Sequence, residues 1–170
     1  MMNPLKMHSE RNPRTSAGGS FKLKPIGSVK SSIIKPVDEN WGSVVSEIHL
    51  DPALAPGLQG LDQFSHILVL FFMDQATFEP SRDLVRRPKG RADMPESGIF
   101  AQRAKHRPNP IGVTAVELLE IRGKVLKVKG LDAIDGSPVL DIKPYFPDFD
   151  RVDQPRVPEW VRRVMEGYFE

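Results

Sequence analysis

The residues best suited to chemistry lie in segment 98–112, which combines arginine, histidine and proline at close spacing. The prolines on either side of Asn109 have fixed φ angles and no backbone donor, so this asparagine sits in a stiff, extended link. A stiff link has little conformational entropy left to lose when a ligand binds. Arg103 and Arg107 come just before it, and a guanidinium can hold a carboxylate or phosphate with two parallel hydrogen bonds. The segment therefore predicts an anion-binding site, with a proline-rich crossover that closes one end of the fold as the structural alternative.

Acidic residues form a second candidate group. Asp132, Asp135 and Asp141 fall within ten residues, and ionised carboxylates accept hydrogen bonds well from the vicinal hydroxyls of a ribose. Lys143 and Tyr145 are two residues apart, so they share one face of a strand and could contact a polar substrate. Asp135 also opens an Asp-Gly pair, a common tight-turn dipeptide, so a purely structural role stays open. Together with the arginine segment, these residues indicate a site for a ligand with an anionic end and a sugar.

Positive charge is concentrated between Arg82 and Arg107, where eight basic residues stand against three acidic ones. Such a cluster could contact phosphates, although a solvated loop with scattered charges has the same composition. The first 25 residues add five basic residues and one acidic one, while the whole chain has a net charge of only +2. The overall charge therefore describes the N-terminal segment more than the domain.

Several functional classes are excluded by composition and motif. The chain has no cysteine, and its four histidines lack metal-ligand spacing, so no metal site is expected. Nucleotide-binding glycine motifs and the nucleophile-elbow motif of hydrolases are absent. The longest apolar run, residues 67–73, has seven residues, whereas a membrane helix needs about 20. With no apolar signal segment in residues 1–20, we expect a cytoplasmic protein that does not bind membranes.

The elements that must position these residues are short and β-like. At 170 residues the chain is expected to form one domain over 21–170, preceded by a disordered arm over the polar residues 1–20. Alternation, apolar runs and turn dipeptides predict strands at 43–50, 64–73, 111–121, 125–131 and 139–143. Strands this short, separated by frequent turns, favour a mainly β fold, either a small antiparallel barrel or a sandwich.

Two segments depart from the strand pattern. Residues 79–97 contain three prolines among charged residues and are expected to form a long loop. Near the C-terminus, Pro158 suits the first turn of a helix. The apolar side chains that follow predict one helical stripe that packs on the barrel or on a partner subunit. The stripe consists of Trp160, Val161, Val164, Met165 and Tyr168.

Six short motifs, taken together, resemble those of the YaeB/TsaA-like (TrmO-type) family over roughly residues 21–150. The motifs are Pro25-Ile26-Gly27, Gly60-Leu61 with Phe64-Ser65-His66, Phe100-Ala101 with Arg103, Arg107-Pro108-Asn109-Pro110-Ile111-Gly112, Asp132 with Asp135-Gly136-Ser137-Pro138, and Asp141-Ile142-Lys143-Pro144-Tyr145. The resemblance implies a small antiparallel β-barrel with short peripheral helices, including a C-terminal one. It also implies a homodimer that uses S-adenosylmethionine, near the subunit interface, to N-methylate threonylcarbamoyladenosine beside the tRNA anticodon.

The resemblance and the side-chain chemistry together assign the candidate site. The expected cofactor-binding residues are Asp74, Gln75, Phe100, Arg103, Asp132, Ala133, Ile134, Asp135, Gly136 and Ser137. The expected substrate-binding residues are Arg107, Asn109, Lys143 and Tyr145. An amide-like or aryl nitrogen is a poor nucleophile, so a nearby proton acceptor would help it to react. Asp135 and Tyr145 are the candidates for this role, and a water molecule is the alternative.

Two other functions remain open at this stage. A dimer could bind or sense S-adenosylmethionine without turnover, or the basic stretch could bind RNA without any chemistry. Multiple-turnover methylation would exclude the first alternative. The second predicts RNA affinity that falls steeply with salt and does not respond to S-adenosylmethionine.

Overall fold

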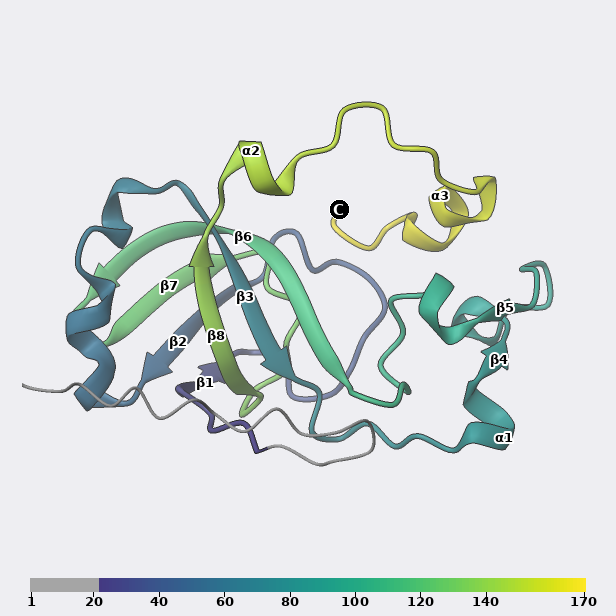
Figure 1. The fold of residues 1–170 in the computed structure, drawn as a ribbon, viewed down its shortest axis with the longest axis horizontal. Helices are drawn as coiled ribbons and strands as arrows, with labels where there is room; N and C mark the ends of the chain where they lie inside the picture. Colours follow the sequence, from purple (N-terminus) through teal and green to yellow (C-terminus); the bar gives the residue numbers. More distant parts are fainter. Residues whose placement is uncertain (1–21) are drawn as a thin grey trace, which may run out of the picture.

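Six strands close into one antiparallel barrel in the computed structural model, which describes residues 22–170 (Figure 1). Around the barrel the order is β1-β2-β7-β6-β3-β8, and each neighbouring pair is antiparallel. The strands are β1 (Gly27–Lys30), β2 (Val45–Leu50), β3 (His66–Phe72), β6 (Ile111–Arg122), β7 (Val125–Lys129) and β8 (Pro138–Pro144). Closure leaves this sheet without a free edge along its length. The expected arm over residues 1–20 lies outside the described residues.

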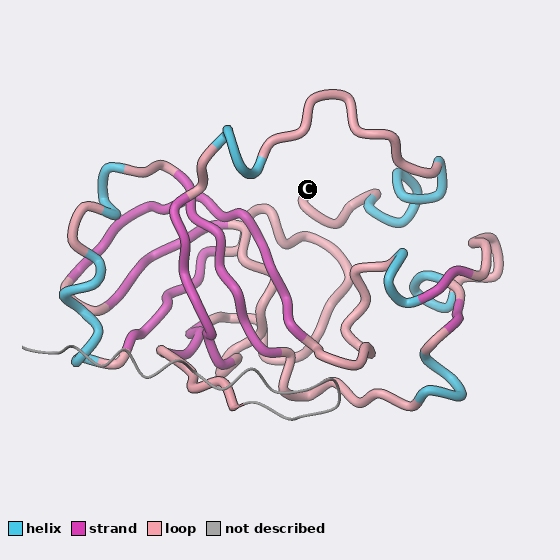
Figure 2. Tube along the Cα trace, in the orientation of Figure 1, coloured by secondary structure: helices cyan, strands magenta, loops and turns pink. Residues whose placement is uncertain are grey.

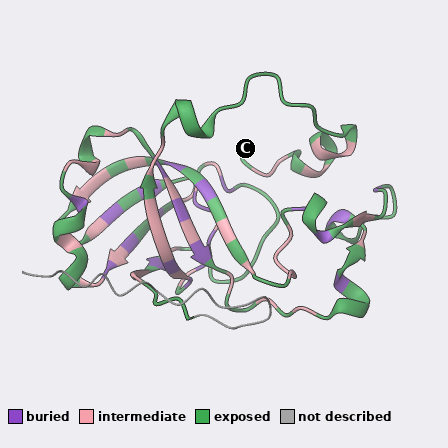
Figure 3. Ribbon diagram, viewed as in Figure 1, coloured by how far each residue is buried: buried purple, intermediate pink, exposed green. Residues whose placement is uncertain are grey.

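The barrel interior is filled by the inward-facing residues of each strand. On β3, Ile67, Val69 and Phe71 are almost fully buried, and the residues between them are more exposed (Figure 3). Leu126 and Val128 make the same contribution from β7. Each such side chain gives about 1.5–3 kcal/mol on burial, so a one-residue slip that turned these side chains outward would be costly.

The predicted fold class is confirmed, with small corrections at the strand ends. Five of the six barrel strands were expected, and β1 was not singled out. β7 ends at Lys129, two residues earlier than expected, because Gly130 has φ 88° and turns the chain away from the sheet. The other elements are α1 (Pro80–Asp83), β4 (Val85–Arg86), β5 (Ser97–Gly98), α2 (Pro147–Asp150), α3 (Glu159–Met165) and 3-10 turns at Pro52–Leu58, Leu61–Gln63, Pro88–Gly90 and Ile99–Ala101.

The segment 79–97, which was expected to form a long loop, includes short regular elements. This segment contains α1 and a two-stranded antiparallel sheet of β4 and β5. Asp83 organises it, because its fully enclosed carboxylate accepts the Glu79 N–H at 2.8 Å and an Arg82 guanidinium N–H at 2.7 Å. These bonds hold the pKa of Asp83 far below its ordinary value. A short polar motif thus folds a segment that has little apolar content.

The C-terminal helix is shorter than its apolar stripe suggested. Pro158 caps α3, which ends at Met165, and Gly167 then reverses the chain with φ 72°. Tyr168 therefore lies beyond the helix rather than on its stripe. Among residues 22–170 no helix has the length and apolarity needed to cross a membrane.

The two ends of the barrel carry different connections (Figure 2). At one end, here called the mouth, residues 31–44, 73–110 and 130–137 join β1 to β2, β3 to β6 and β7 to β8. At the opposite end lie the connection from β2 to β3, the tight β6–β7 turn and the end of β8. Most of the expected site residues fall in connections at the mouth.

Candidate functional site

Asp132 is the polar centre of the mouth. It follows the turn at Gly130, and each of its two carboxylate oxygens accepts one hydrogen bond from a hydroxyl group. Thr114, on the inward face of β6, donates to Oδ1, and the Tyr168 phenol donates to Oδ2 at 2.8 Å. A carboxylate has about four acceptor positions, so this arrangement fixes the group and leaves capacity for a ligand. Burial and the adjacent Asp132 charge raise the pKa of Tyr168, which keeps its phenol neutral and donating.

Arg103 lies at the same end of the barrel. One terminal nitrogen of its guanidinium donates to the main-chain oxygen of Val113, the residue before Thr114. The Arg103 charge also acts on the Tyr168 phenol, where it opposes the rise in pKa. The arginine segment and the Asp132 segment therefore both contact the start of β6. The roles of the two residues toward a cofactor remain predictions.

Hydrogen bonds within the long connection (residues 73–110) hold the arginine segment in place. The Gln102 side chain is 7% exposed and donates to the main-chain oxygens of Arg86 and Ser97 at 2.8 and 2.9 Å. Arg107, an expected substrate ligand, donates to the Gln102 main-chain oxygen at 3.2 Å and so braces the same turn. The segment is thus a folded support for Arg103.

The ends of the long connection meet beside the barrel. The Met73 N–H donates to the Pro110 oxygen at 2.8 Å, just after β3 and just before β6. Asp74 and Gln75 are exposed in the turn next to this bond, and Asn109 is exposed on the other side of it. Phe100 is 80% exposed on its 3-10 turn. The connection therefore places all four of these expected residues on the mouth side of the barrel.

Residues 132–137 divide into exposed and buried positions. Asp135 is partly exposed and accepts the Ser31 N–H at 3.0 Å and the Lys30 ammonium at 3.3 Å. These contacts lower its pKa, so Asp135 is a weak proton acceptor that anchors the loop to β1. Ala133, Ile134 and Ser137 are buried, and Gly136 has φ 83°. A ligand would therefore meet these four residues through their main chain.

Lys143 and Tyr145 do not join the other expected residues within one chain. Both lie at the end of β8 opposite the mouth, where the Tyr145 N–H donates to the His66 oxygen at 3.1 Å. The Lys143 ammonium pairs with Asp141 at 2.7 Å, and that partner raises its pKa. Their spacing of two predicted a shared strand face, but spacing along a strand does not reveal which end of the barrel carries the site.

Two glycines of the motifs serve packing. A Cβ on Gly112 would lie 2.6 Å from a ring carbon of Phe71, the residue directly opposite it on β3. A Cβ on Gly27 would lie 2.9 Å from the Leu50 Cα and closer still to the His49 oxygen. Sequence reasoning missed this role. It also missed Thr114 as an Asp132 partner, although a hydroxyl two residues before the inward-facing Val116 was a signal.

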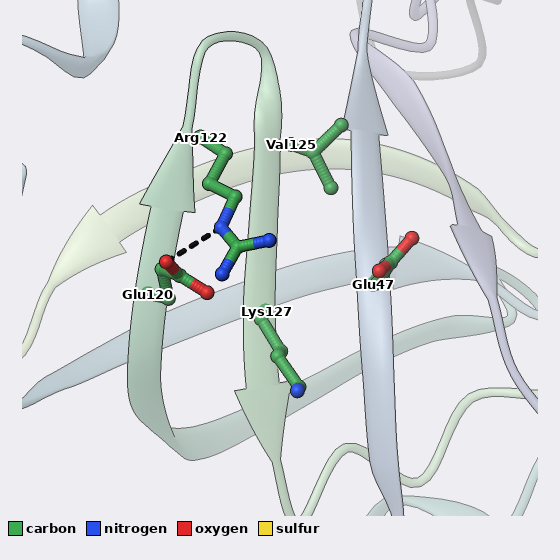
Figure 4. Close-up of a pocket in the computed structure, with 5 residues that line it drawn as sticks. All are labelled: Glu47, Glu120, Arg122, Val125 and Lys127. Carbon is green, nitrogen blue, oxygen red and sulfur yellow. Dashed lines mark hydrogen bonds and ion pairs between the residues drawn. The ribbon is translucent and has the colours of Figure 1, made fainter.

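A hollow on the outer surface is separate from the mouth (Figure 4). It lies over β2, β6 and β7 and is lined by Glu47, Glu120, Arg122, Val125 and Lys127. The Arg122 guanidinium pairs with Glu120 at 2.6 Å, and Lys127 stands opposite both glutamates across the sheet. Alternating charges of this kind are typical of the solvent-exposed outer face of a barrel, so we assign the hollow no ligand. Within the described residues no three potential metal ligands come together.

Comparison with known proteins gives consistent results. A family model described as the tRNA-methyltransferase O N-terminal domain matches residues 35–151. An S-adenosyl-L-methionine-binding protein from Archaeoglobus fulgidus is 45% identical over 137 residues, covering 78% of this chain and 94% of that protein. A tRNA (adenine(37)-N6)-methyltransferase from Escherichia coli is 40% identical over 141 residues, covering 75% of this chain and 59% of that protein. The crystal structure of TrmO from Pseudomonas aeruginosa superposes with a TM-score of 0.66 at 32% identity, covering 81% of this chain and 62% of that one.

Proposed function

We propose that this chain, which belongs to the tRNA-methyltransferase O N-terminal domain family, transfers a methyl group from S-adenosylmethionine to an adenosine nitrogen in tRNA. The family predicted from the motifs is confirmed. The proposed acceptor is the N6 nitrogen of threonylcarbamoyladenosine beside the anticodon, and the proposed assembly is a cytoplasmic homodimer. The observation that carries the proposal is the convergence of Arg103 and Asp132 at the mouth.

The side chains at the mouth fit the charged groups of the cofactor. The Arg103 guanidinium uses one donor on Val113 and has others for a carboxylate. Asp132 is held by Thr114 and Tyr168 and still has acceptor positions for ribose hydroxyls or an ammonium group. When bound, S-adenosylmethionine supplies a methyl group that is activated by its sulfonium leaving group. The protein's own contribution is then mainly placement, which is worth about 7–11 kcal/mol in well-oriented reactions.

The acceptor nitrogen must also lose a proton. Asp135 belongs to the same β7–β8 connection as Asp132, but its lowered pKa and its bonds to Ser31 and Lys30 make it a weak base. Tyr145 lies at the opposite barrel end, so its role as proton acceptor requires the proposed homodimer to bring it to the mouth of another subunit. Light scattering after size-exclusion chromatography tests the dimer. A monomer at all concentrations would remove Tyr145 from the mechanism.

The basic stretch between Arg82 and Arg107 supports tRNA as the substrate. Several of its charges are paired, as in Arg82 with Asp83 and Arg91 with Asp93, both at 2.7 Å. Pairing does not remove the excess of basic over acidic residues there, and the stretch belongs to the same long connection as Arg103. Phosphates bound to it would bring the RNA near the mouth.

Methyl transfer is tested with labelled S-adenosylmethionine and tRNA that carries threonylcarbamoyladenosine. We expect label in the tRNA over many turnovers, and cofactor binding in calorimetry. Arg103→Ala should lose most cofactor affinity. Arg151→Ala is the matched control, because Arg151 is exposed and pairs with the nearby Asp153 at 2.8 Å. If the wild-type protein shows no methyl transfer and no cofactor binding, the proposal is refuted.

A second candidate function is cofactor binding without turnover. It is supported by two archaeal relatives, one named as a probable S-adenosyl-L-methionine-binding protein and one as an S-adenosyl-L-methionine-binding protein, of which this chain covers 93% and 94%. It spans only about three fifths of the bacterial methyltransferase named above. Both functions predict that Arg103→Ala weakens cofactor binding. Multiple-turnover methylation separates them, and cofactor binding with no transfer to any tRNA would favour the second.

A further inference from the structure

The chain end supplies a residue to the mouth from outside the matched family region. The family model covers residues 35–151, whereas the phenol that bonds Asp132 belongs to Tyr168. We propose that Tyr168 is a positioning residue that holds the Asp132 carboxylate for the cofactor, which makes residues 167–170, the C-terminal strap, part of the cofactor site. This inference rests on the proposed function.

The C-terminal strap is attached to the barrel by main-chain bonds. The N–H groups of Asn40 and Trp41 donate to the Gly167 and Tyr168 oxygens, both at 2.8 Å. The strap lies so close to Gly42 that a Cβ there would be 2.7 Å from the carbonyl carbon of Phe169. Because residues 40–42 belong to the β1–β2 connection at the mouth, this pairing delivers Tyr168 to one defined place.

The Tyr168 ring is enclosed by several segments. The Lys89 ammonium lies 5.7 Å from the ring centroid and donates to the Asp38 oxygen at 3.0 Å. The Phe169 ring packs edge-on at 4.9 Å between centroids. The Tyr168 ring thus contacts Lys89 of the long connection and Phe169 of the strap, while only its hydroxyl bonds the β7–β8 loop. The ring is therefore fixed by contacts that do not involve its hydroxyl.

The hydroxyl has a separate effect on Asp132. A hydroxyl that donates to an ionised carboxylate makes a strong, directional bond. With Thr114 on one oxygen and Tyr168 on the other, the carboxylate cannot rotate, and its unused acceptor positions keep one direction. Burial and the Asp132 charge raise the pKa of Tyr168, so this donor persists throughout the neutral range. Removal of the hydroxyl leaves Asp132 with one tether and more freedom, at a cost to ligand binding.

The test compares Tyr168→Phe with the wild-type protein. This change removes one oxygen and keeps the ring, and Phe149→Leu is the control because Phe149 is 83% exposed on α2, outside the strap and the mouth. We expect Kd and KM for S-adenosylmethionine to rise about tenfold in Tyr168→Phe, the effect typical of a bond to a charged group. KM for tRNA should not change. A merely structural role would lower the active fraction, and hence kcat, without raising KM for the cofactor.

Gly42→Ala tests the strap without touching the site. Its new methyl group would push on the Phe169 main chain, so the strap and Tyr168 should move away and cofactor affinity should fall as in Tyr168→Phe. Wild-type affinity in Tyr168→Phe would overturn the role of the hydroxyl, and wild-type affinity in Gly42→Ala would overturn the role of the strap. Failure of the wild-type protein itself to bind S-adenosylmethionine would instead refute the proposed function.

Discussion

Gly112→Ala probes the contact between the final glycine of the Arg-Pro-Asn-Pro-Ile-Gly motif and the barrel core. The new methyl carbon would lie 2.6 and 2.7 Å from two carbons of the Phe71 ring, well inside van der Waals contact. Phe71 is 3% exposed and packed between strands, so the ring cannot move aside freely. We therefore expect the substitution to destabilise the barrel.

The size of the effect follows from two opposing contributions. Overpacking of a core costs about 1–3 kcal/mol. Replacement of glycine by alanine restricts the unfolded chain and returns about 0.4–1 kcal/mol. A net loss of about 1–2 kcal/mol remains. For a domain of this size it lowers Tm by about 2–4 °C per kcal/mol, or roughly 2–8 °C in total.

Thermal and urea unfolding measure the effect. Gly57→Ala is the control, because a Cβ at Gly57 would have no neighbour within 4 Å. Phe71→Leu, which removes the clashing ring atoms, should be less damaging when combined with Gly112→Ala than the sum of the two single changes. Gly27→Ala clashes with main chain, so no side-chain change should rescue it. Wild-type stability of Gly112→Ala, or strict additivity with Phe71→Leu, would refute this account of the motif.

Three further outcomes are expected. The folded-state pKa of Asp135 lies below the unfolded value, so its bonds stabilise the fold above pH about 4 and are lost in acid. The unfolding free energy of Asp135→Asn, measured by urea unfolding at several pH values, should therefore fall less in acid than that of the wild-type protein. An unchanged pH dependence would contradict this. The pKa of Tyr168 is raised, so its contribution is complete below pH about 10 and falls above it. Tyr168→Phe should lose less stability than the wild-type protein between about pH 9 and 11, and parallel curves would count against the raised pKa. Asp83→Asn should speed proteolysis within residues 79–97 while barrel amides stay protected from hydrogen exchange; faster exchange throughout the barrel would show that Asp83 supports more than its own segment.

The barrel could be predicted because its signals are local. The apolar run of β3 and the turn between β6 and β7 depend on residues close in sequence. The sequence also assigned Arg103 and residues 132–135 to one candidate site from their side-chain chemistry, and that assignment remains a prediction. By contrast, β1 has only four residues, and their alternation is too brief to stand out.

The errors concern relations that sequence spacing does not encode. Lys143 and Tyr145 were expected at the site, but the direction of β8 places them at the far end. Tyr168 was assigned to the helical stripe, but the positive φ of Gly167 turns the chain beyond the helix and allows Tyr168 to bond Asp132. The fold of residues 79–97 depends on one enclosed carboxylate, and composition gives no sign that Asp83 is enclosed. In each case a single long-range or backbone feature outweighed a correct local pattern.

The bond between Met73 and Pro110 gives the long connection the geometry of an insertion whose entry and exit coincide. A segment with adjacent ends can be exchanged for another of different length with little disturbance to the strands that flank it. The barrel strands can thus stay constant while the inserted segment varies. We expect a chimera that carries the corresponding segment of a relative, joined at these two positions, to keep the fold of the barrel.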